Sequence, residues 1–246
     1  MIRTSGKRKP KFMVNNMNKT YTANRQITEI LRTDQWSGKR CFIIGGGEAL
    51  ESFDFTKLKG EKTIGINKAF LFCNTDILYS MDIRYYFWLM EGRLDEMEKD
   101  NVKGKWLASR AVKTWLCPIS YHKFHPSVYL IRRMNDKGVY RDLKHGIYGG
   151  NNSGFGALML AIALGANPIY LLGYAMKCNT KTHFHTGYPE SKLNRMQKKV
   201  ISYKKMFEHF APKIKETGKK VVNLVIKDKD ETALSCFDIE MVNNIL

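Results

Sequence analysis

The sequence predicts an α/β protein with a Rossmann-like, mostly parallel sheet and helices on both faces. Three observations support this prediction. Short apolar runs of the kind found in buried strands alternate with helical patterns along the chain. Several of these runs end directly in Gly, Asn or Asp, as parallel strands do where they meet a ligand. The chain has 246 residues and 43% hydrophobic residues, enough for one sizeable core.

We expect the chain to divide into a basic arm with a short helix over residues 1–37 and a single Rossmann-like domain over residues 38–246. Residues 1–23 show no convincing period and are typical of a flexible arm. Residues 25–35 carry apolar side chains at the spacing of a short amphipathic helix, with Trp36 as its anchor.

The predicted core begins with a buried strand, Cys41–Ile44, that runs into the turn Gly45-Gly46-Gly47-Glu48. Nucleotide-binding α/β domains often begin in this way, because glycines let the backbone approach a phosphate closely. The pattern is not GxGxxG, and no Walker lysine motif is present, which argues against a P-loop enzyme.

Two further strands are predicted at Thr63–Ile66 and Asp76–Ser80, followed by Asn67-Lys68 and by Asp82. Both ends fall on the side of the sheet where a ligand binds. The Asn67 amide suits a base or ribose edge, and the Asp82 carboxylate suits a metal ion or a hydroxyl. Capping of the following helix is an equally good interpretation of Asp82.

The middle of the chain is harder to interpret. Residues 84–99 are expected to form an aromatic-rich helix whose four consecutive aromatic residues cannot all face one core. Residues 105–110 and 129–133 are strand candidates, and residues 115–125 are expected to form a loop over the site.

A Gly/Asn/Ser turn, Asn151-Asn152-Ser153-Gly154, precedes an apolar helix over residues 155–164 that Gly165 should end. The backbone N–H groups around Ser153 and Gly154 therefore form a potential anion site.

A buried strand follows at Ile169–Leu172 and ends at Gly173-Tyr174. His183 and His185 lie in the polar segment beyond it, and a histidine near neutral pKa can act as a general base. Two surface histidines are the alternative.

The C-terminal part is predicted to hold a long basic helix over residues 190–216, a strand over residues 221–226 and a short closing segment over residues 232–237. Asp228-Lys229-Asp230 resembles a metal-binding DxD, but its charged surroundings favour an ordinary turn.

The charge is unusual for an ordinary domain, with a net value of +18. Residues 1–40, 101–150 and 182–220 hold thirty of the forty-one Lys and Arg residues and seven of the twenty-three acidic ones. Such a field favours a polyanionic partner: nucleic acid, an anionic membrane surface or a highly charged small ligand, with DNA as the main expectation. A basic solvated surface is the alternative.

The five cysteines show no CxxC spacing, which fits a reducing compartment and argues against a structural zinc site. No apolar run approaches the length of a membrane span, so a cytoplasmic protein is expected, in a host cytoplasm if it is phage-encoded.

Three segments together resemble a known family. "CFIIGGGEAL…FDFTKLK…TIGINKAF" and "NNSGFGALMLAIALGANPIYLLGY" resemble the two nucleotide-binding motifs of bacterial sialyltransferases that build lipooligosaccharides. "THF", the long helix and "KKVVNLVIKDKDETALSCF" resemble their His-containing segment and C-terminal part. The motility-accessory-factor and 6-hydroxymethylpterin diphosphokinase-like proteins, with phage proteins of similar pattern, fit almost as well.

The resemblance implies a Rossmann-like variant of the glycosyltransferase A fold, with a nucleotide-sugar donor and no tightly bound cofactor or metal. His183 would be the general base, with His185 as the competing candidate. Asp82, from its place after the strand Asp76–Ser80, is the third candidate catalytic residue. The sequence departs from the family at Gly47-Glu48-Ala49, where Gly-Pro-Ser is usual. The predicted nucleotide-binding residues are Gly45, Gly46, Gly47, Glu48, Asn67, Lys68, Asn152, Ser153, Gly154, Gly173 and Tyr174.

Three functions follow as hypotheses. The first is a nucleotide-sugar-dependent glycosyltransferase whose acceptor is polyanionic, in its sharpest form hydroxymethylated DNA of the phage type. The second is a pterin-type pyrophosphokinase that uses ATP and Mg²⁺, with Asp82 as a metal ligand. The third is a nucleic-acid-binding protein without catalysis on the same scaffold.

Overall fold

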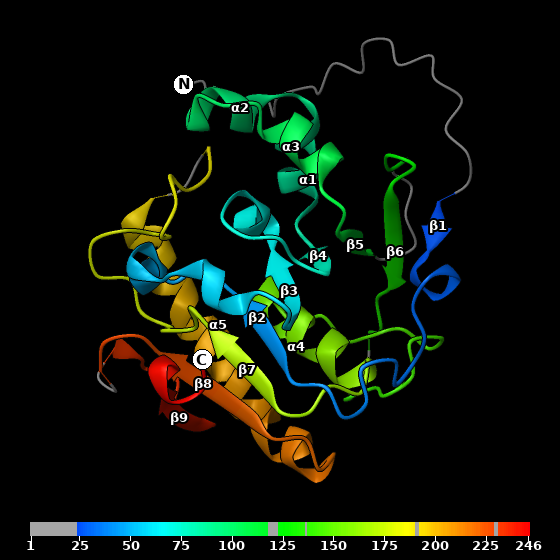
Figure 1. The fold of residues 1–246 in the computed structure, drawn as a ribbon, viewed down its shortest axis with the longest axis vertical. Helices are drawn as coiled ribbons and strands as arrows, with labels where there is room; N and C mark the ends of the chain where they lie inside the picture. Colours follow the sequence, from blue (N-terminus) through cyan, green and yellow to red (C-terminus); the bar gives the residue numbers. More distant parts are fainter. Residues whose placement is uncertain (1–23, 118–122, 136, 190–191, 229–230) are drawn as a thin grey trace, which may run out of the picture.

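The computed structural model describes residues 24–117, 123–135, 137–189, 192–228 and 231–246. It confirms the α/β Rossmann-like fold, with a nine-stranded parallel sheet in the order β1-β6-β5-β4-β3-β2-β7-β8-β9 (Figure 1). The strands are β1 (Arg25–Gln26), β2 (Cys41–Ile44), β3 (Lys62–Ile66), β4 (Ile77–Ser80), β5 (Val112–Cys117), β6 (Val128–Arg132), β7 (Ile169–Leu172), β8 (Val221–Val225) and β9 (Asp238–Met241).

Helices cover both faces of the sheet, because alternate residues of each buried strand point to opposite sides. The apolar side chains of α4 and α5 pack on one face, and those of α1, α2 and α3 pack on the other, over β4, β5 and β6. Short 3-10 turns complete the second face over β2 and β7. The helices are α1 (Ile83–Met90), α2 (Arg93–Glu98), α3 (Val102–Ala108), α4 (Ser153–Ala163) and α5 (Leu193–Glu216).

The order of the strands reverses beside β2. From β2 the chain adds β3, β4, β5 and β6 towards one edge and then returns to place β7 on the other side of β2. Ligands of open α/β sheets bind at the carboxyl ends of the strands next to such a reversal. The fold therefore directs attention to the segments that follow β2, β3, β4 and β7.

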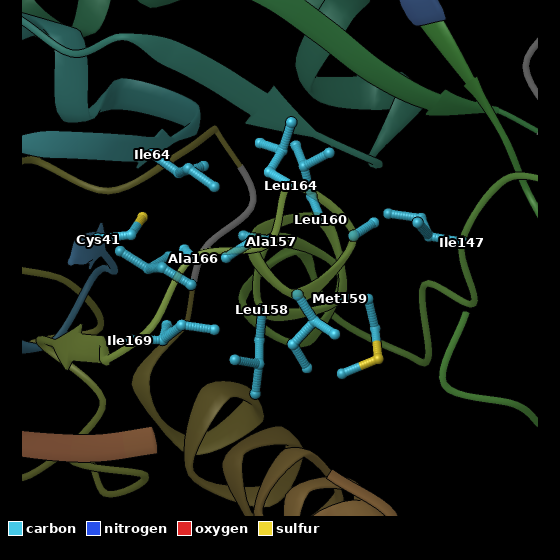
Figure 2. Close-up of a cluster of buried hydrophobic side chains, with 14 of the residues drawn as sticks. Cys41, Ile64, Ile147, Ala157, Leu158, Met159, Leu160, Leu164, Ala166 and Ile169 are labelled. Carbon is cyan, nitrogen blue, oxygen red and sulfur yellow. The ribbon is translucent and has the colours of Figure 1, made fainter. Parts of the chain in front are cut away.

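Helix α4 is buried along its whole length, as its apolar sequence predicts. Figure 2 shows side chains of β2, β3 and β7, among them Cys41, Ile64 and Ile169, gathered around it. Its C-terminal end is also covered, because the backbone N–H groups of Asp34 and Trp36 donate to the carbonyl oxygens of residues 163 and 164. These contacts fix the position of the whole helix, and with it the position of its N-terminal end.

The strands predicted at residues 41–44, 63–66, 76–80, 169–172 and 221–226 are confirmed as β2, β3, β4, β7 and β8. The predicted end of α4 at Gly165 is confirmed as well, and this glycine has a φ of +83°. Within the described residues, no helix is both long and apolar enough to cross a membrane. All five cysteines are free.

The prediction of a helix over residues 25–35 is wrong. This segment forms the two-residue strand β1 and a 3-10 turn, η1 (Ile27–Glu29), both of which pack against β6. Ile27 and Trp36 are buried in the core that surrounds α4. The predicted arm over residues 1–23 lies outside the described residues.

Two predictions in the middle of the chain are also wrong. Residues 105–110 belong mostly to α3, which the Asn101 side chain caps by accepting a hydrogen bond from the Gly104 N–H at 2.8 Å. Residues 115–117 are part of strand β5 rather than a loop, and residues 118–122 lie outside the described part. The helix predicted over residues 84–99 is split into α1 and α2 at Gly92, which has a φ of +76°.

Candidate functional site

A pocket of about 500 Å³ opens at the carboxyl ends of the central strands. The glycine turn after β2, Asn67 after β3, Asp82 after β4 and Gly173-Tyr174 after β7 all line it. The N-terminal ends of α4 and α5 complete the wall. Its size falls in the range of sites that hold small molecules and nucleotides.

Twelve of the fourteen candidate residues named from the sequence line this pocket. They come from segments up to 140 positions apart, so the fold and not the sequence order brings them together. The twelve are Gly45, Gly46, Gly47, Asn67, Asp82, Asn152, Ser153, Gly154, Gly173, Tyr174, His183 and His185.

Lys68 does not line the pocket, which corrects its place in the predicted nucleotide-binding set. Its side chain is fully buried, and its ammonium donates to the carboxylate of Glu98 and to the carbonyl oxygen of Gly187 at 2.5 Å. Burial lowers the pKa of Lys68, and the hydrogen bond that its ammonium donates to Glu98 opposes that shift. Lys68 therefore anchors the loop that carries the histidines rather than facing a ligand.

Glu48 is the second correction. Its carboxylate accepts hydrogen bonds from the backbone N–H groups of Thr180 at 3.2 Å and Lys181 at 2.9 Å. Burial works against the carboxylate, but these backbone hydrogen bonds win and lower its pKa. Glu48 thus holds the loop that leads into the histidine segment, and a carboxylate in this position would repel a phosphate.

The three glycines after β2 are required by contacts within the protein. A Cβ atom at Gly45 or at Gly47 would lie 2.8 Å or 2.7 Å from the carbonyl oxygen of Gly173. A Cβ atom at Gly46 would lie 2.9 Å from Cδ2 of His183. The carbonyl oxygen of Gly46 also accepts from the N–H of Phe184 at 3.1 Å. The turn therefore seats the histidine segment against β2.

His183 and His185 lie side by side in the pocket wall. Their rings stack with centroids 4.9 Å apart and an angle of 15° between the planes. Tyr188 packs edge-on against both, at 5.0 Å and 5.3 Å. Phe184, between them in sequence, points into the core on the other side. The order His-Phe-His thus places both imidazoles on the pocket side and the phenyl ring in the core.

Both imidazoles are neutral at physiological pH. Burial, with the nearby charges of Lys68 and Lys199, lowers the pKa of His183 to about 4. Burial, His183 and Lys68 lower the pKa of His185 to about 2. Nδ1 of His185 accepts from the Gly187 N–H at 3.0 Å, which fixes its proton on the other ring nitrogen. His183 makes no such backbone contact and is the better placed of the two to take up a proton.

Asp82 caps helix α1 and pairs with Arg84. Its carboxylate accepts from the Arg84 N–H at 3.0 Å, from Nε at 3.2 Å and from Nη2 at 2.8 Å. Burial works against the Asp82 carboxylate, but the hydrogen bonds from Arg84 win and lower its pKa. Both of its oxygens are therefore already engaged. Among the described residues, no group of three His, Cys, Asp or Glu side chains is arranged to hold a metal ion.

The N-terminal end of α4 is capped at one position. The Asn152 side chain accepts from the Phe155 N–H at 2.8 Å. The hydroxyl group of Tyr174 donates to the carbonyl oxygen of Gly154 at 3.1 Å and so holds this first turn against β7. Ser153 and Gly154 line the pocket beside this cap, where helix N–H groups and the helix dipole favour an anion.

Five basic side chains and a single carboxylate, that of Asp82, line the described part of the pocket. Sequence reasoning counted the charge of this region but did not assign these residues to the site. Their spacing over residues 192, 195 and 199 was the available signal, since it places three cations on one side of a helix. The five are Arg84, Lys177, Lys192, Arg195 and Lys199.

Asn67 connects the pocket to a small cavity behind it. Its backbone φ is +51°, and its amide hydrogen-bonds with Tyr188. A cavity of about 10 Å³ lies behind it. Polar side-chain atoms of Asn67, Ser80, Tyr85 and Trp115 at this cavity are buried and have no hydrogen-bond partner among the described residues. Groups of this kind are usually satisfied by an internal water molecule.

Comparison with protein-family models, with curated proteins and with solved structures finds no match for this chain. What the pocket binds and does therefore follows from its own residues: a neutral histidine pair, a helix N-terminus and an excess of positive charge at the switch point of a Rossmann-like sheet.

Proposed function

We propose that the protein is a transferase that moves a group, in its best-supported form a glycosyl group, from a nucleotide-linked donor to an acceptor hydroxyl. The observation that carries the proposal is a neutral imidazole, His183, in the wall of a positively charged pocket at the strand ends. The positive charge suits the phosphates of a donor, and the neutral imidazole suits the removal of a proton.

The donor would bind with its phosphate groups near the first turn of α4. Ser153 and Gly154 supply backbone N–H groups there, and Lys177 adds a positive charge to the same pocket. Asn67 offers an amide at the end of β3, and Trp88 and Tyr203 offer flat apolar surface to a base or sugar ring. This arrangement needs no phosphate contact from the glycine turn.

The transfer step would use His183 as the general base. The acceptor oxygen forms a bond to the donor carbon, the bond from that carbon to the phosphate oxygen breaks, and the hydroxyl proton passes to His183. The departing nucleoside phosphate keeps the electron pair, and the basic side chains of the pocket stabilise its charge. An anion bound beside Lys199 would also raise the pKa of His183 from about 4, because it offsets a charge that lowers that pKa.

The engagement of Asp82 favours this function over a pterin-type pyrophosphokinase. That reaction relies on Mg²⁺, and the sequence offered Asp82 as its ligand. In the structure, the two carboxylate oxygens of Asp82 accept hydrogen bonds from the backbone and the guanidinium of Arg84. A metal ion would have to compete with an intact ion pair.

The first test is a thermal-shift screen with nucleoside mono- and diphosphates, nucleotide sugars and ATP, each with and without Mg²⁺. A ligand present at about 100 times its Kd adds about 2.7 kcal/mol, which is a shift of several degrees. Stabilisation by a nucleotide or nucleotide sugar without Mg²⁺ supports the transferase and names its donor class. Stabilisation by ATP only with Mg²⁺ favours the kinase, and no shift at all favours a binding protein without catalysis.

The second test separates catalysis from binding. His183→Ala should abolish turnover of the donor identified in the screen while changing its Kd by less than about threefold. His209→Ala is the matched control, since His209 is an exposed histidine on α5 that does not line the pocket. Equal activity of the two variants would remove His183 from the mechanism.

A further inference from the structure

The N-terminal part of α5 carries charge in the wrong sense for a helix. Lys192 precedes the helix as its N-cap residue, Arg195 and Lys199 follow within two turns, and the first turn has no acidic residue. The N-terminal end of a helix bears partial positive charge, so cations there cost stability and anions add to it. Departures of this kind from local preference are expected at binding sites.

These three cations line the pocket, and none of them forms an ion pair with a carboxylate in the described part of the chain. All three line it, at spacings of three and four residues that place them on one side of α5. In the described part of the chain none of their side chains makes a hydrogen bond or a salt bridge, whereas the Lys204 side chain further along α5 pairs with Glu208 at 3.5 Å. Arg84, by contrast, is compensated by Asp82. The uncompensated charge of the pocket is thus concentrated at one place.

This charge exceeds what one donor needs. A nucleoside diphosphate sugar brings two negative charges, and the first turn of α4 with Lys177 already offers them an anion site. Lys192, Arg195 and Lys199 would remain with three positive charges and no partner. Repulsion is already felt there, because burial together with Arg84 and Arg195 lowers the pKa of Lys199.

The position of this group relative to His183 indicates which substrate it serves. The positive charge of Lys199 is near enough to His183 to lower the pKa of that imidazole. An anion held by Lys199 would therefore lie beside the base that takes the acceptor's proton. A group in that place belongs more naturally to the acceptor than to the far end of the donor.

On this basis, and resting on the transferase function proposed above, we infer that the acceptor carries a phosphate ester, which binds Lys192, Arg195 and Lys199 at the N-terminal end of α5. The phosphate offsets part of the positive charge of the three cations and accepts hydrogen bonds from the N–H groups at the end of the helix. It also fixes the acceptor with its hydroxyl towards His183. The site takes either the backbone phosphate of a nucleic acid or the phosphate of a small phosphorylated acceptor.

The test compares two double variants of the full-length protein with equal loss of charge. R195Q/K199Q removes two of the three cations in the pocket. K205Q/K215Q removes two exposed lysines from the same helix that neither line the pocket nor form a described ion pair. Circular dichroism and thermal melting establish that both variants are folded.

Three probes are then titrated at about 50 mM salt, where phosphate contacts are strong. A fluorescein-labelled single-stranded oligonucleotide is followed by anisotropy, and inorganic phosphate and nucleoside diphosphates are followed by calorimetry. R195Q/K199Q should weaken the binding of the oligonucleotide, or of inorganic phosphate, about tenfold or more. K205Q/K215Q should change the affinity for either probe less than about twofold. Loss with the oligonucleotide assigns the phosphate to a nucleic acid, and loss with phosphate alone assigns it to a small acceptor.

Three outcomes would overturn the inference. Equal losses in the two variants would show that the whole basic surface binds, without a site at α5. A loss of nucleoside diphosphate affinity as large as the loss with the other probes would make these cations the donor's phosphate site. Absence of any oligonucleotide or phosphate binding by the unchanged protein would leave no site at all. Failure of the proposed transferase function would give a different result. The unchanged protein would then bind no nucleotide, while R195Q/K199Q would still bind the oligonucleotide or phosphate more weakly than K205Q/K215Q does.

Discussion

The ammonium of Lys68 donates to the carbonyl oxygen of Gly187 at 2.5 Å, and this contact ties the segment after β3 to the loop that bears both histidines. The same ammonium bonds the carboxylate of Glu98, which accepts from the Thr186 hydroxyl as well. A single buried cation therefore joins η4 (Asn67–Leu71), α2 and the histidine loop. It positions His183 without touching the pocket.

Lys68→Met should destabilise the fold strongly. The substitution leaves the Glu98 carboxylate, whose side chain is only 14% exposed, without its partner, and breaking a buried pair costs about 3 kcal/mol or more. Urea unfolding measures the loss. Lys62→Met is the control. Lys62 forms an ion pair with Asp76, and their side chains are 39% and 30% exposed, so this pair should contribute less than about 1 kcal/mol. Similar losses in both variants would mean that Lys68 is no anchor.

The two neutral histidines make stability depend on pH in a defined direction. Their pKa values are about 4 and about 2 in the folded protein, below the ordinary value of 6.5. The unfolded chain therefore binds more protons, and the free energy of unfolding rises with pH in this range. The stabilising contribution of both histidines is fully present above pH 6.5. As the pH falls, the contribution of His183 is lost down through about pH 4, and that of His185 continues to be lost down to about pH 2.

Urea unfolding at several pH values between 4 and 7 tests this. The double variant H183Q/H185Q removes both groups and should show a flatter profile across this window. A variant whose profile follows that of the unchanged protein would place the acid sensitivity elsewhere, for example in the carboxylates.

Gly46→Ala should damage the site more than the fold. The added methyl group meets only the ring of His183, 2.9 Å away, and a side chain can move aside. Gly47→Ala meets the backbone carbonyl of Gly173 at 2.7 Å, so relief there requires β2 and β7 to shift. We expect Gly46→Ala to lower activity at least about tenfold with little change in Tm, since a misplaced catalytic group costs this much. Gly47→Ala should lower the Tm itself. The reverse ranking of the two melting temperatures would contradict this interpretation.

The cavity behind Asn67 should contain one ordered water molecule. Its volume of about 10 Å³ is close to the minimum for a single water, and Tyr85 and Trp115 offer donors opposite the Asn67 oxygen. A crystal structure at high resolution would show it directly. Tyr85→Phe removes one donor and should weaken or displace this water with the cavity wall otherwise kept. An empty cavity in the unchanged protein would contradict the prediction.

Sequence patterns predicted most of the central strands of the sheet and missed β5. The run Cys41–Ile44 is buried at every position and was recognised as β2. Strand β5 was missed because two of its buried positions are polar, Lys113 and Thr114. The Lys113 ammonium bonds the Ser109 carbonyl oxygen at 2.6 Å and Thr114 bonds the Leu78 carbonyl oxygen at 3.0 Å. Such partners become visible only once the strands are paired.

Most of the pocket could be predicted for a related reason. Residues that directly follow a parallel strand share one edge of the sheet, so Asn67, Asp82 and Gly173 were found without knowledge of their contacts. The direction of a side chain in a turn is a different matter. Lys68 follows Asn67 immediately, but the left-handed backbone of Asn67, with φ of +51°, turns the lysine into the core. No pattern in the sequence signals that turn.

The pairing of β2 with β7 joins Cys41 to Ile169, two residues that lie far apart in the chain. During synthesis, β2 therefore leaves the ribosome long before β7, the neighbour that covers one of its edges. Until β7 has been made, that edge of β2 stays unpaired. Pairings of such long range form slowly and leave strand edges open to other chains in the meantime. The pocket, which needs both strands, is completed only in the second half of translation, so truncated chains that end before residue 169 should aggregate rather than bind a ligand.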